Sequence, residues 1–236
     1  MRQQMAAVVV GVMAMVALAA PSAVAPAHAS GGVVAGQDLQ SSMVAMPGAH
    51  WWSQESENSC SIGWIVNDGS ENYAFTAGHC ANKGDSAFLG GQSRALGTVA
   101  LSEFIVSDGY RAEFDYGAVK LDRSVAVSDV VPGFGSPARI MSTEELSRTK
   151  PDLCIVGQTS GLHCGEFIEL VLEDSQGVFR AETMRGDSGG AVFAIQTDGD
   201  VVAVGTLVGN EEGSPDRTVV QLLDGSLPVG MSLGQI

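Results

Sequence analysis

The chain has 236 residues, and its 45% hydrophobic content is ample for a packed core. Its 27 acidic side chains outnumber the 12 basic ones and leave a formal net charge of −15. This charge argues against binding to nucleic acid or to an anionic membrane, because both repel an acidic surface. We interpret it as a source of solubility outside the cell, with a preference for cationic substrates as the weaker alternative.

The N-terminal residues have the pattern of an export signal. Arg2 precedes an uncharged apolar run from Ala6 to Ala20, and a proline-containing stretch then leads to Ala27-His28-Ala29. The pattern predicts a signal peptide at 1–29 with cleavage after Ala29. A retained membrane anchor is the alternative, but the apolar run is short for a membrane span. We therefore expect a secreted, extracellular protein in an oxidising environment.

The remainder of the chain is long enough for one large domain or two small ones. Residues 30–58 are rich in glycine, serine and other small residues, apart from the stretch His50-Trp51-Trp52. We expect this segment to be a loosely ordered N-terminal arm or a short propeptide. A further boundary is expected within 124–136, which carries glycine and proline and lacks a clear periodicity.

Short runs rich in Val, Ile, Phe and Thr alternate with turn residues along the rest of the chain. The strands predicted in this way are Ile62–Val66, Tyr73–Thr76, Ala95–Ala100, Tyr116–Leu121, Phe167–Leu172, Gly189–Ile195 and Val201–Val208. The hairpin-type turns are Asp68-Gly69, Asp108-Gly109, Asp198-Gly199 and Asp224-Gly225. By contrast, Ser142–Arg148 could form a short capped helix. The pattern predicts an all-β sandwich or barrel.

The chain has four cysteines, and the export signal makes two disulfide bonds the expected arrangement. Three pairings are possible. We favour Cys60–Cys80 and Cys154–Cys164, because each pair closes a short local loop. A zinc site is the alternative, but the chain has no Cys-x-x-Cys pair of the usual ligand spacing, and we expect no metal.

Three segments, far apart in the chain, carry residue types that together could activate a nucleophile: Tyr73–Cys80 with His79, Phe114–Leu121 with Asp115, and Met184–Phe193 with Ser188. A serine hydroxyl is a weak nucleophile that needs an adjacent base. Each residue alone has a simpler interpretation, as a structural histidine, a turn-capping aspartate and a plain glycine-rich loop. Their conjunction, in the order His–Asp–Ser in an exported β-rich chain, favours the catalytic interpretation.

These motifs resemble those of the trypsin/chymotrypsin family of serine proteases, especially its bacterial streptogrisin-like branch. "TAGHC" (76–80) and "GDSGG" (186–190) match the family's histidine and serine motifs, and "FDYGAVKL" (114–121) is similar to its aspartate segment. "CSIGWIV" (60–66) and "GQTSGLHCG" (157–165) resemble streptogrisin segments that carry cysteines. The resemblance covers roughly residues 60–236. It implies two packed antiparallel β-barrels, which we expect at 59–125 and 126–236, with the catalytic groups at their junction.

The resemblance also implies a role for each residue of the site. Ser188 is the nucleophile, His79 takes its proton and returns it to the leaving amine, and Asp115 fixes the histidine tautomer. The backbone N–H groups of Gly186 and Ser188 form the oxyanion hole. The strand context favours Asp115 over other acids nearby. Those acids are Asp108, Asp122 and Asp129.

The aspartate before the nucleophile, Asp187, is implied to be structural. In the family this residue is buried and paired with a positive group that holds the oxyanion loop. In animal relatives that group is a freed N-terminus, and the segment Gly31–Leu39 is vaguely similar to it. In streptogrisins it is an internal arginine, for which Arg139 is the candidate in this chain.

The primary specificity pocket is harder to assign, because this chain lacks the cysteine that streptogrisins carry shortly before the serine motif. Counting back from Ser188 puts Glu182 at the base of the pocket, where a carboxylate would favour lysine or arginine side chains. An insertion in this loop would move Glu182 elsewhere.

The segment 205–213 resembles the strand that lines the substrate groove, with Val208, Gly209 and Asn210 as its wall. Glutamate-specific relatives carry a histidine in this strand. This chain has none there, so we do not expect glutamate specificity.

The sequence thus predicts a secreted serine endopeptidase that acts on protein or peptide substrates through an acyl-enzyme intermediate. We expect a monomer without a cofactor, a metal, a nucleic-acid partner or a membrane. The competing hypotheses are a catalytically silent binding protein on the same fold and an esterase-like hydrolase that uses the same acyl chemistry.

Overall fold

The computed structural model describes residues 43–90, 94–107 and 111–234, all of which belong to one structural unit, Gly31–Ile236. The expected signal peptide and the expected turn at Asp108-Gly109 lie outside the described residues. In the part that is described, no helix combines the length and the apolar character needed to cross a membrane.

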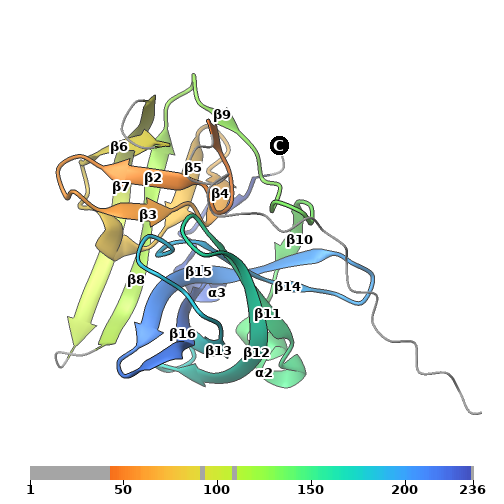
Figure 1. Cartoon of the computed structure of the whole chain (residues 1–236). Helices are drawn as coiled ribbons and strands as arrows, with labels where there is room; N and C mark the ends of the chain where they lie inside the picture. The colour runs from red at the N-terminus through yellow and green to blue at the C-terminus, as the bar shows by residue number, and fades with distance from the viewer. Residues whose placement is uncertain (1–42, 91–93, 108–110, 235–236) are drawn as a thin grey trace, which may run out of the picture. The chain divides into compact units, whose positions relative to one another are not determined.

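The first sheet has eight strands in the order β17-β4-β5-β8-β7-β6-β2-β3, and every neighbouring pair is antiparallel. Figure 1 labels all of these strands except β17. The strands are β2 (His50–Ser53), β3 (Ser59–Ser61), β4 (Trp64–Asn67), β5 (Asn72–Thr76), β6 (Ser86–Leu89), β7 (Arg94–Ser107), β8 (Arg111–Leu121) and β17 (Ser232–Leu233). Among the described residues β17 and β3 do not pair, so this unit is a curled sheet with two edges.

Part of the segment 30–58 contributes strands. Strand β2 pairs with both β3 and β6, and its Trp51 is buried in the core of the first sheet. Strand β1 (Val44–Ala45) runs parallel to β9 (Ala126–Val127). Burial alternates along β2, with Trp51 and Ser53 as its buried residues, as expected for a strand that covers one side of a core.

The second sheet has seven strands in the order β10-β15-β14-β11-β12-β13-β16, and an additional pairing of β15 with β16 closes it into a barrel. The strands are β10 (Pro137–Ile140), β11 (Asp152–Gly157), β12 (Gly161–Val171), β13 (Gln176–Arg180), β14 (Ala191–Ile195), β15 (Val201–Glu211) and β16 (Ser214–Leu222). Strand β10 lies outside the closed barrel and runs parallel to β15.

The helical elements of the described residues are short: η1 (Gly78–Cys80), α2 (Thr143–Thr149) and α3 (Leu223–Ser226). Helix α2 is the one that the sequence predicted. The Ser142 side chain accepts a hydrogen bond from the Glu145 N–H, which satisfies a free donor at the start of the helix.

The first sheet and the closed barrel share a buried core, which explains why several strands are apolar along their whole length. In β4, Trp64 and Val66 face this shared core, whereas Ile65 faces the core of the first sheet. In β14, Phe193 faces the shared core and Val192 the barrel interior. The Trp64 indole N–H also donates to the Gly205 carbonyl at 2.8 Å. The expected all-β, two-barrel architecture is therefore confirmed, with the first barrel as a curled sheet.

Both favoured disulfide bonds are present. Cys60–Cys80 joins β3 to η1, and Cys154–Cys164 joins residues directly opposite each other in β11 and β12. Each bridge joins neighbouring elements within one unit, so the bridges brace each unit separately and do not link the two.

Candidate active site

His79 lies on η1, the tight turn that follows β5, and a disulfide bond, a hydrogen bond and a close approach of two backbone segments fix this turn. Cys80 is tied to Cys60 by the disulfide, and the Ser102 hydroxyl donates to the Gly78 carbonyl at 3.0 Å. Gly78 is required because a Cβ there would lie 2.2 Å from the Glu103 carbonyl oxygen. The ring of His79 can therefore take up a defined position.

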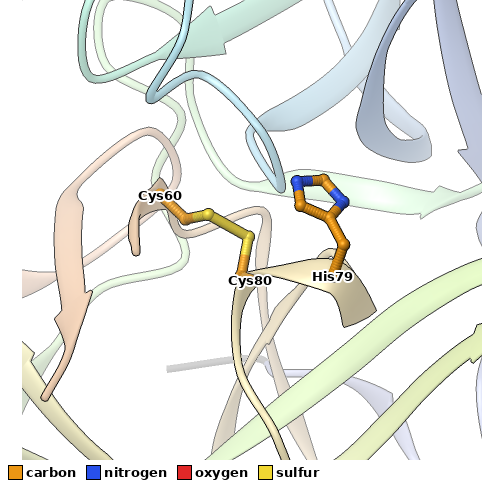
Figure 2. A group of neighbouring side chains, drawn as sticks. All are labelled: Cys60, His79 and Cys80. Carbon is orange, nitrogen blue, oxygen red and sulfur yellow. A yellow bond between two sulfur atoms is a disulfide. The ribbon is translucent and has the colours of Figure 1, made fainter. Parts of the chain in front are cut away.

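Figure 2 shows the His79 ring and the disulfide leaving neighbouring backbone positions in different directions. Their ligand-type atoms lie within 4.8 Å of one another, but the two sulfur atoms are bonded to each other. A disulfide offers no thiolate, so this group does not have the chemistry of a Cys–His metal site.

Asp115, in the middle of β8, is fully buried and binds His79 twice. Its Oδ2 lies 2.7 Å from the ring Nδ1, and its Oδ1 accepts the His79 backbone N–H at 2.9 Å. The ring is 29% exposed, so its other nitrogen can face solvent. A carboxylate held in this way selects the tautomer with a proton on Nδ1 and leaves Nε2 free to accept a proton.

Two buried glutamines, which sequence analysis did not single out, tie the Asp115 strand to the second barrel. The Gln221 Oε1 accepts the Asp115 N–H at 3.2 Å, and the Gln221 amide nitrogen donates to the Ser175 carbonyl at 3.0 Å. Gln176 donates to the Ala112 carbonyl at 2.9 Å and to Gln221 at 3.3 Å. The aspartate is thus positioned by side chains from β13 and β16.

Ser188 lies in the loop between β13 and β14, and its neighbours pack against the turn that carries His79. The Ser61 N–H donates to the Ser188 carbonyl at 2.8 Å. Gly189 has φ of 82°, and a Cβ there would lie 2.0 Å from Thr76 Oγ1 and 2.9 Å from the Ala77 nitrogen. Only glycine allows this approach. No hydrogen bond joins Ser188 Oγ to His79 among the described residues, and such bonds often form only when substrate binds.

The loop before Ser188 presents free backbone donors. Gly186 has φ of 99°, and a Cβ there would lie 2.1 Å from the Gln158 amide nitrogen. In the described part of the chain, neither the Gly186 N–H nor the Ser188 N–H donates to an acceptor, whereas the N–H groups of Asp187, Gly189 and Gly190 all do. Two unused donors that flank a serine can bind a developing oxyanion.

Asp187 is fully buried, but the predicted ion pair with Arg139 is wrong. Its carboxylate accepts hydrogen bonds from the Thr159 N–H (2.9 Å), the Ser160 N–H (3.0 Å), the Ser160 hydroxyl (2.6 Å) and the Met184 N–H (2.8 Å). No ion pair to Asp187 forms within residues 43–90, 94–107 and 111–234. Four neutral donors hold this carboxylate where a cation was expected.

Arg139 pairs with Glu145 instead, through two hydrogen bonds of 2.7 Å. Strand β10 lies outside the closed barrel, next to helix α2, and this position puts Arg139 at the surface. The ion pair raises the pKa of Arg139 and lowers that of Glu145.

The expected substrate wall, Val208 to Asn210, follows the point at which β15 binds the nucleophile loop. Leu207 exchanges two hydrogen bonds with this loop, to Gly189 at 2.7 Å and to Gly190 at 2.9 Å. A pocket of about 330 Å³ is lined by Val208, Gly209 and Asn210 together with other residues of β8, β13, β15 and β16. A second pocket, of about 470 Å³, is lined by His79, Phe104 and their neighbours.

The other residues noted in the sequence lie apart from this arrangement. Glu182 is exposed. Asp122 and Asp129 do not contact His79 in the described structure, and Asp108 lies outside the described residues. Asp115 is thus the acid that the fold brings to the histidine.

Solved structures with the same fold were found by comparison. Thermobifida fusca protease A aligns with a TM-score of 0.62 at 25% identity, over 80% of this chain and 98% of the other. Cellulomonas bogoriensis chymotrypsin aligns with a TM-score of 0.60 at 24% identity, over 81% and 99%. Nocardiopsis protease aligns with a TM-score of 0.60 at 20% identity, over 80% and 98%. No protein-family model and no curated protein matches the chain.

Proposed function

We propose that this chain, which has the chymotrypsin-like fold of bacterial serine proteases, is a secreted serine endopeptidase. The observation that carries the proposal is the buried Asp115 bound to Nδ1 of His79, in a turn that packs against the loop of Ser188. Two unused backbone donors in that loop add the second element that acyl transfer requires.

In the proposed reaction, Ser188 Oγ attacks the carbonyl carbon of the scissile peptide bond while His79 Nε2 takes the hydroxyl proton. The carbonyl oxygen becomes an oxyanion that the Gly186 and Ser188 N–H groups stabilise. Each such donor contributes about 2.7–4 kcal/mol in related catalysis. Asp115 stabilises the imidazolium ion through the Nδ1 proton.

Collapse of the tetrahedral intermediate breaks the C–N bond, and His79 returns its proton to the leaving amine. An acyl-enzyme ester on Ser188 remains. Water then attacks this ester with His79 as the base, and the second collapse releases the carboxylic acid and restores the serine hydroxyl.

The exposed wall of β15 fits a peptide substrate better than a compact small molecule. A Cβ on Gly209 would contact nothing within 4 Å. Strand β14 pairs with β15 only as far as Thr206, so the edge of 208–210 that lies opposite β16 pairs with no described strand. An extended peptide could pair with it as an added strand. Two disulfide bonds and the predicted signal peptide support function outside the cell.

Labelling of the purified chain with a fluorophosphonate, followed by peptide mapping, tests the proposal. We expect a covalent adduct on Ser188, loss of the adduct in Ser188→Ala, and an unchanged adduct in the control Ser70→Ala, whose side chain lies in a surface turn. Absence of the adduct on folded protein would contradict catalysis and favour a binding protein. Labelling with hydrolysis of esters but not of peptides would favour the esterase alternative.

A further inference from the structure

The two backbone donors of the proposed oxyanion hole belong to two different peptide groups. The Gly186 N–H shares a peptide group with the Arg185 carbonyl, and the Ser188 N–H shares one with the Asp187 carbonyl. The C=O and N–H of a trans peptide point in opposite directions, and no peptide bond among the described residues is cis. Whatever binds each carbonyl therefore fixes the direction in which the donor of the same peptide group points.

The two carbonyls are bound in different ways. The Asp187 carbonyl accepts the Gly190 backbone N–H at 2.8 Å, so the backbone itself sets the direction of the donor in that peptide group. The Arg185 carbonyl accepts the hydroxyl of Thr159, a residue 26 positions away in the chain, at 2.9 Å. The direction of the Gly186 donor thus depends on a side chain, which a substitution can remove.

The peptide group between Arg185 and Gly186 is able to rotate. A rotation by half a turn would change φ of Gly186 from its present 99° to a negative value, and glycine accepts both signs of φ at little cost. After such a rotation the carbonyl oxygen would lie where the N–H lies now, and it would repel an oxyanion instead of binding it. The hydrogen bond from the Thr159 hydroxyl opposes this rotation.

Thr159 is itself held in the position that this hydrogen bond requires. The backbone N–H groups of Thr159 and Ser160 donate to Asp187 Oδ1 at 2.9 and 3.0 Å. The Ser160 carbonyl lies 3.2 Å from Nε2 of His163. A Cβ on Gly186 would lie 2.4 Å from the Thr159 hydroxyl oxygen, so a side chain at that position would displace the hydroxyl. The turn therefore presents this hydroxyl from a fixed position.

We infer that Thr159 is a positioning residue of the proposed reaction, because its hydroxyl holds the Gly186 N–H in the direction that binds the oxyanion. Thr159 acts through the Arg185 carbonyl and not on the substrate. Loss of the hydroxyl should therefore leave substrate binding intact and weaken an interaction that is made only in the transition state. The inference rests on the proposed function and deepens it.

The test compares Thr159→Val, which removes the hydroxyl but nearly keeps the shape of the side chain, with Thr159→Ser, which keeps the hydroxyl. For a peptide that the wild-type protein cleaves, Thr159→Val should lower kcat at least about 10-fold, up to the roughly 100- to 1,000-fold cost of losing one oxyanion donor. KM should stay nearly unchanged. Thr159→Ser should keep most of the wild-type kcat, because the hydroxyl donor is still present.

A peptidyl aldehyde measures oxyanion binding more directly, because its adduct with Ser188 places an oxygen in the oxyanion hole. The Ki of the aldehyde should rise in Thr159→Val by the same factor by which kcat/KM falls. Thr149→Val is the matched control. It removes a threonine hydroxyl that donates to the Glu145 carbonyl in helix α2, and it should leave both kcat and the Ki unchanged.

Fluorophosphonate labelling carried to completion supplies the active fraction of each variant, and thermal melting verifies the fold. If Thr159→Val does not fold, Thr159→Ala takes its place in the same comparison. An unchanged kcat or an unchanged Ki in the folded variant, a loss confined to KM, or an equal loss in Thr159→Ser would overturn the inference but leave the proposed function intact. Failure of the wild-type protein to label on Ser188 would overturn both.

Discussion

The two halves of the candidate site are supported in different ways. In the first sheet, His79 is held by the buried carboxylate of Asp115 and by the disulfide bond that the next residue, Cys80, forms with Cys60. In the second barrel, the loop of Ser188 is held by glycines with positive φ and by an aspartate that receives only neutral donors. The acid–base half thus depends on charge, whereas the nucleophile half depends on backbone shape. Substitutions in each half can test the role of charge and the role of backbone shape separately.

The largest effect is expected in the first half. Asp115→Asn should lower kcat by roughly 10,000-fold, because an amide nitrogen facing Nδ1 favours the tautomer in which Nε2 carries the proton. Steady-state kinetics on a peptide that the wild-type protein cleaves measures this loss, and circular dichroism verifies the fold. A loss of less than about 10-fold would show that Asp115 does not orient the base.

In the second half, Asp187→Asn should lower kcat/KM by roughly 100-fold, because an amide cannot accept all four hydrogen bonds and the oxyanion loop shifts. The loss of a buried acceptor should also destabilise the fold by about 1–3 kcal/mol in urea unfolding. Arg139→Gln is the matched control. It removes the surface pair with Glu145 and should leave kcat/KM unchanged, whereas a matching loss would restore a role for Arg139 in the loop.

The connection between the halves should give a smaller effect. Gln221→Leu removes the acceptor of the Asp115 N–H and should lower kcat roughly 10-fold with little change in KM, since it displaces the catalytic pair and not the substrate wall. Gln196→Leu, in a β14–β15 turn, serves as the control. A change in KM alone would place the influence of Gln221 on substrate binding instead.

The smallest effect is expected far from the site, in the turn between β4 and β5. Hydrogen bonds from the Glu71 and Ser70 N–H groups and from the Tyr73 hydroxyl hold the pKa of Asp68 far below its usual range. A depressed pKa stabilises the fold above the unfolded value of about 3.9, and this contribution is lost as the pH falls further.

Asp68→Asn should therefore lower the urea midpoint slightly at pH 7, and the difference from wild type should shrink below about pH 3.9. Activity at pH 7 should be unchanged. A difference that grows on acidification would contradict the assigned cause.

The sequence predicted the parts of the site that depend on short motifs. His79, Asp115 and Ser188 each lie in a compact stretch whose chemistry can be recognised without knowing what lies opposite. The two disulfides followed from loop length, and helix α2 from its capping serine. The strand at His50–Ser53 was missed because the surrounding small residues suggested an arm. The run "HWWS" has no alternation of polar and apolar residues, and the alternating burial along it is visible only in the structure.

The supporting contacts could not be derived in this way, because they join residues that only the strand register brings together. Gln221 and Asp115 are 106 positions apart, and Thr159 and Asp187 are 28 apart. The Arg139 prediction failed for the same reason. Its partner depends on the position of β10 at the barrel surface, which no local pattern encodes.

The pairing of β17 with β4 has a consequence for how the protein unfolds. The chain leaves the first sheet, builds the whole closed barrel and then returns two residues to the sheet it started from. The closed barrel therefore lies in the chain between strands of the first sheet, and neither part can unfold without disturbing its connection to the other. Heating should therefore produce one cooperative transition for both units.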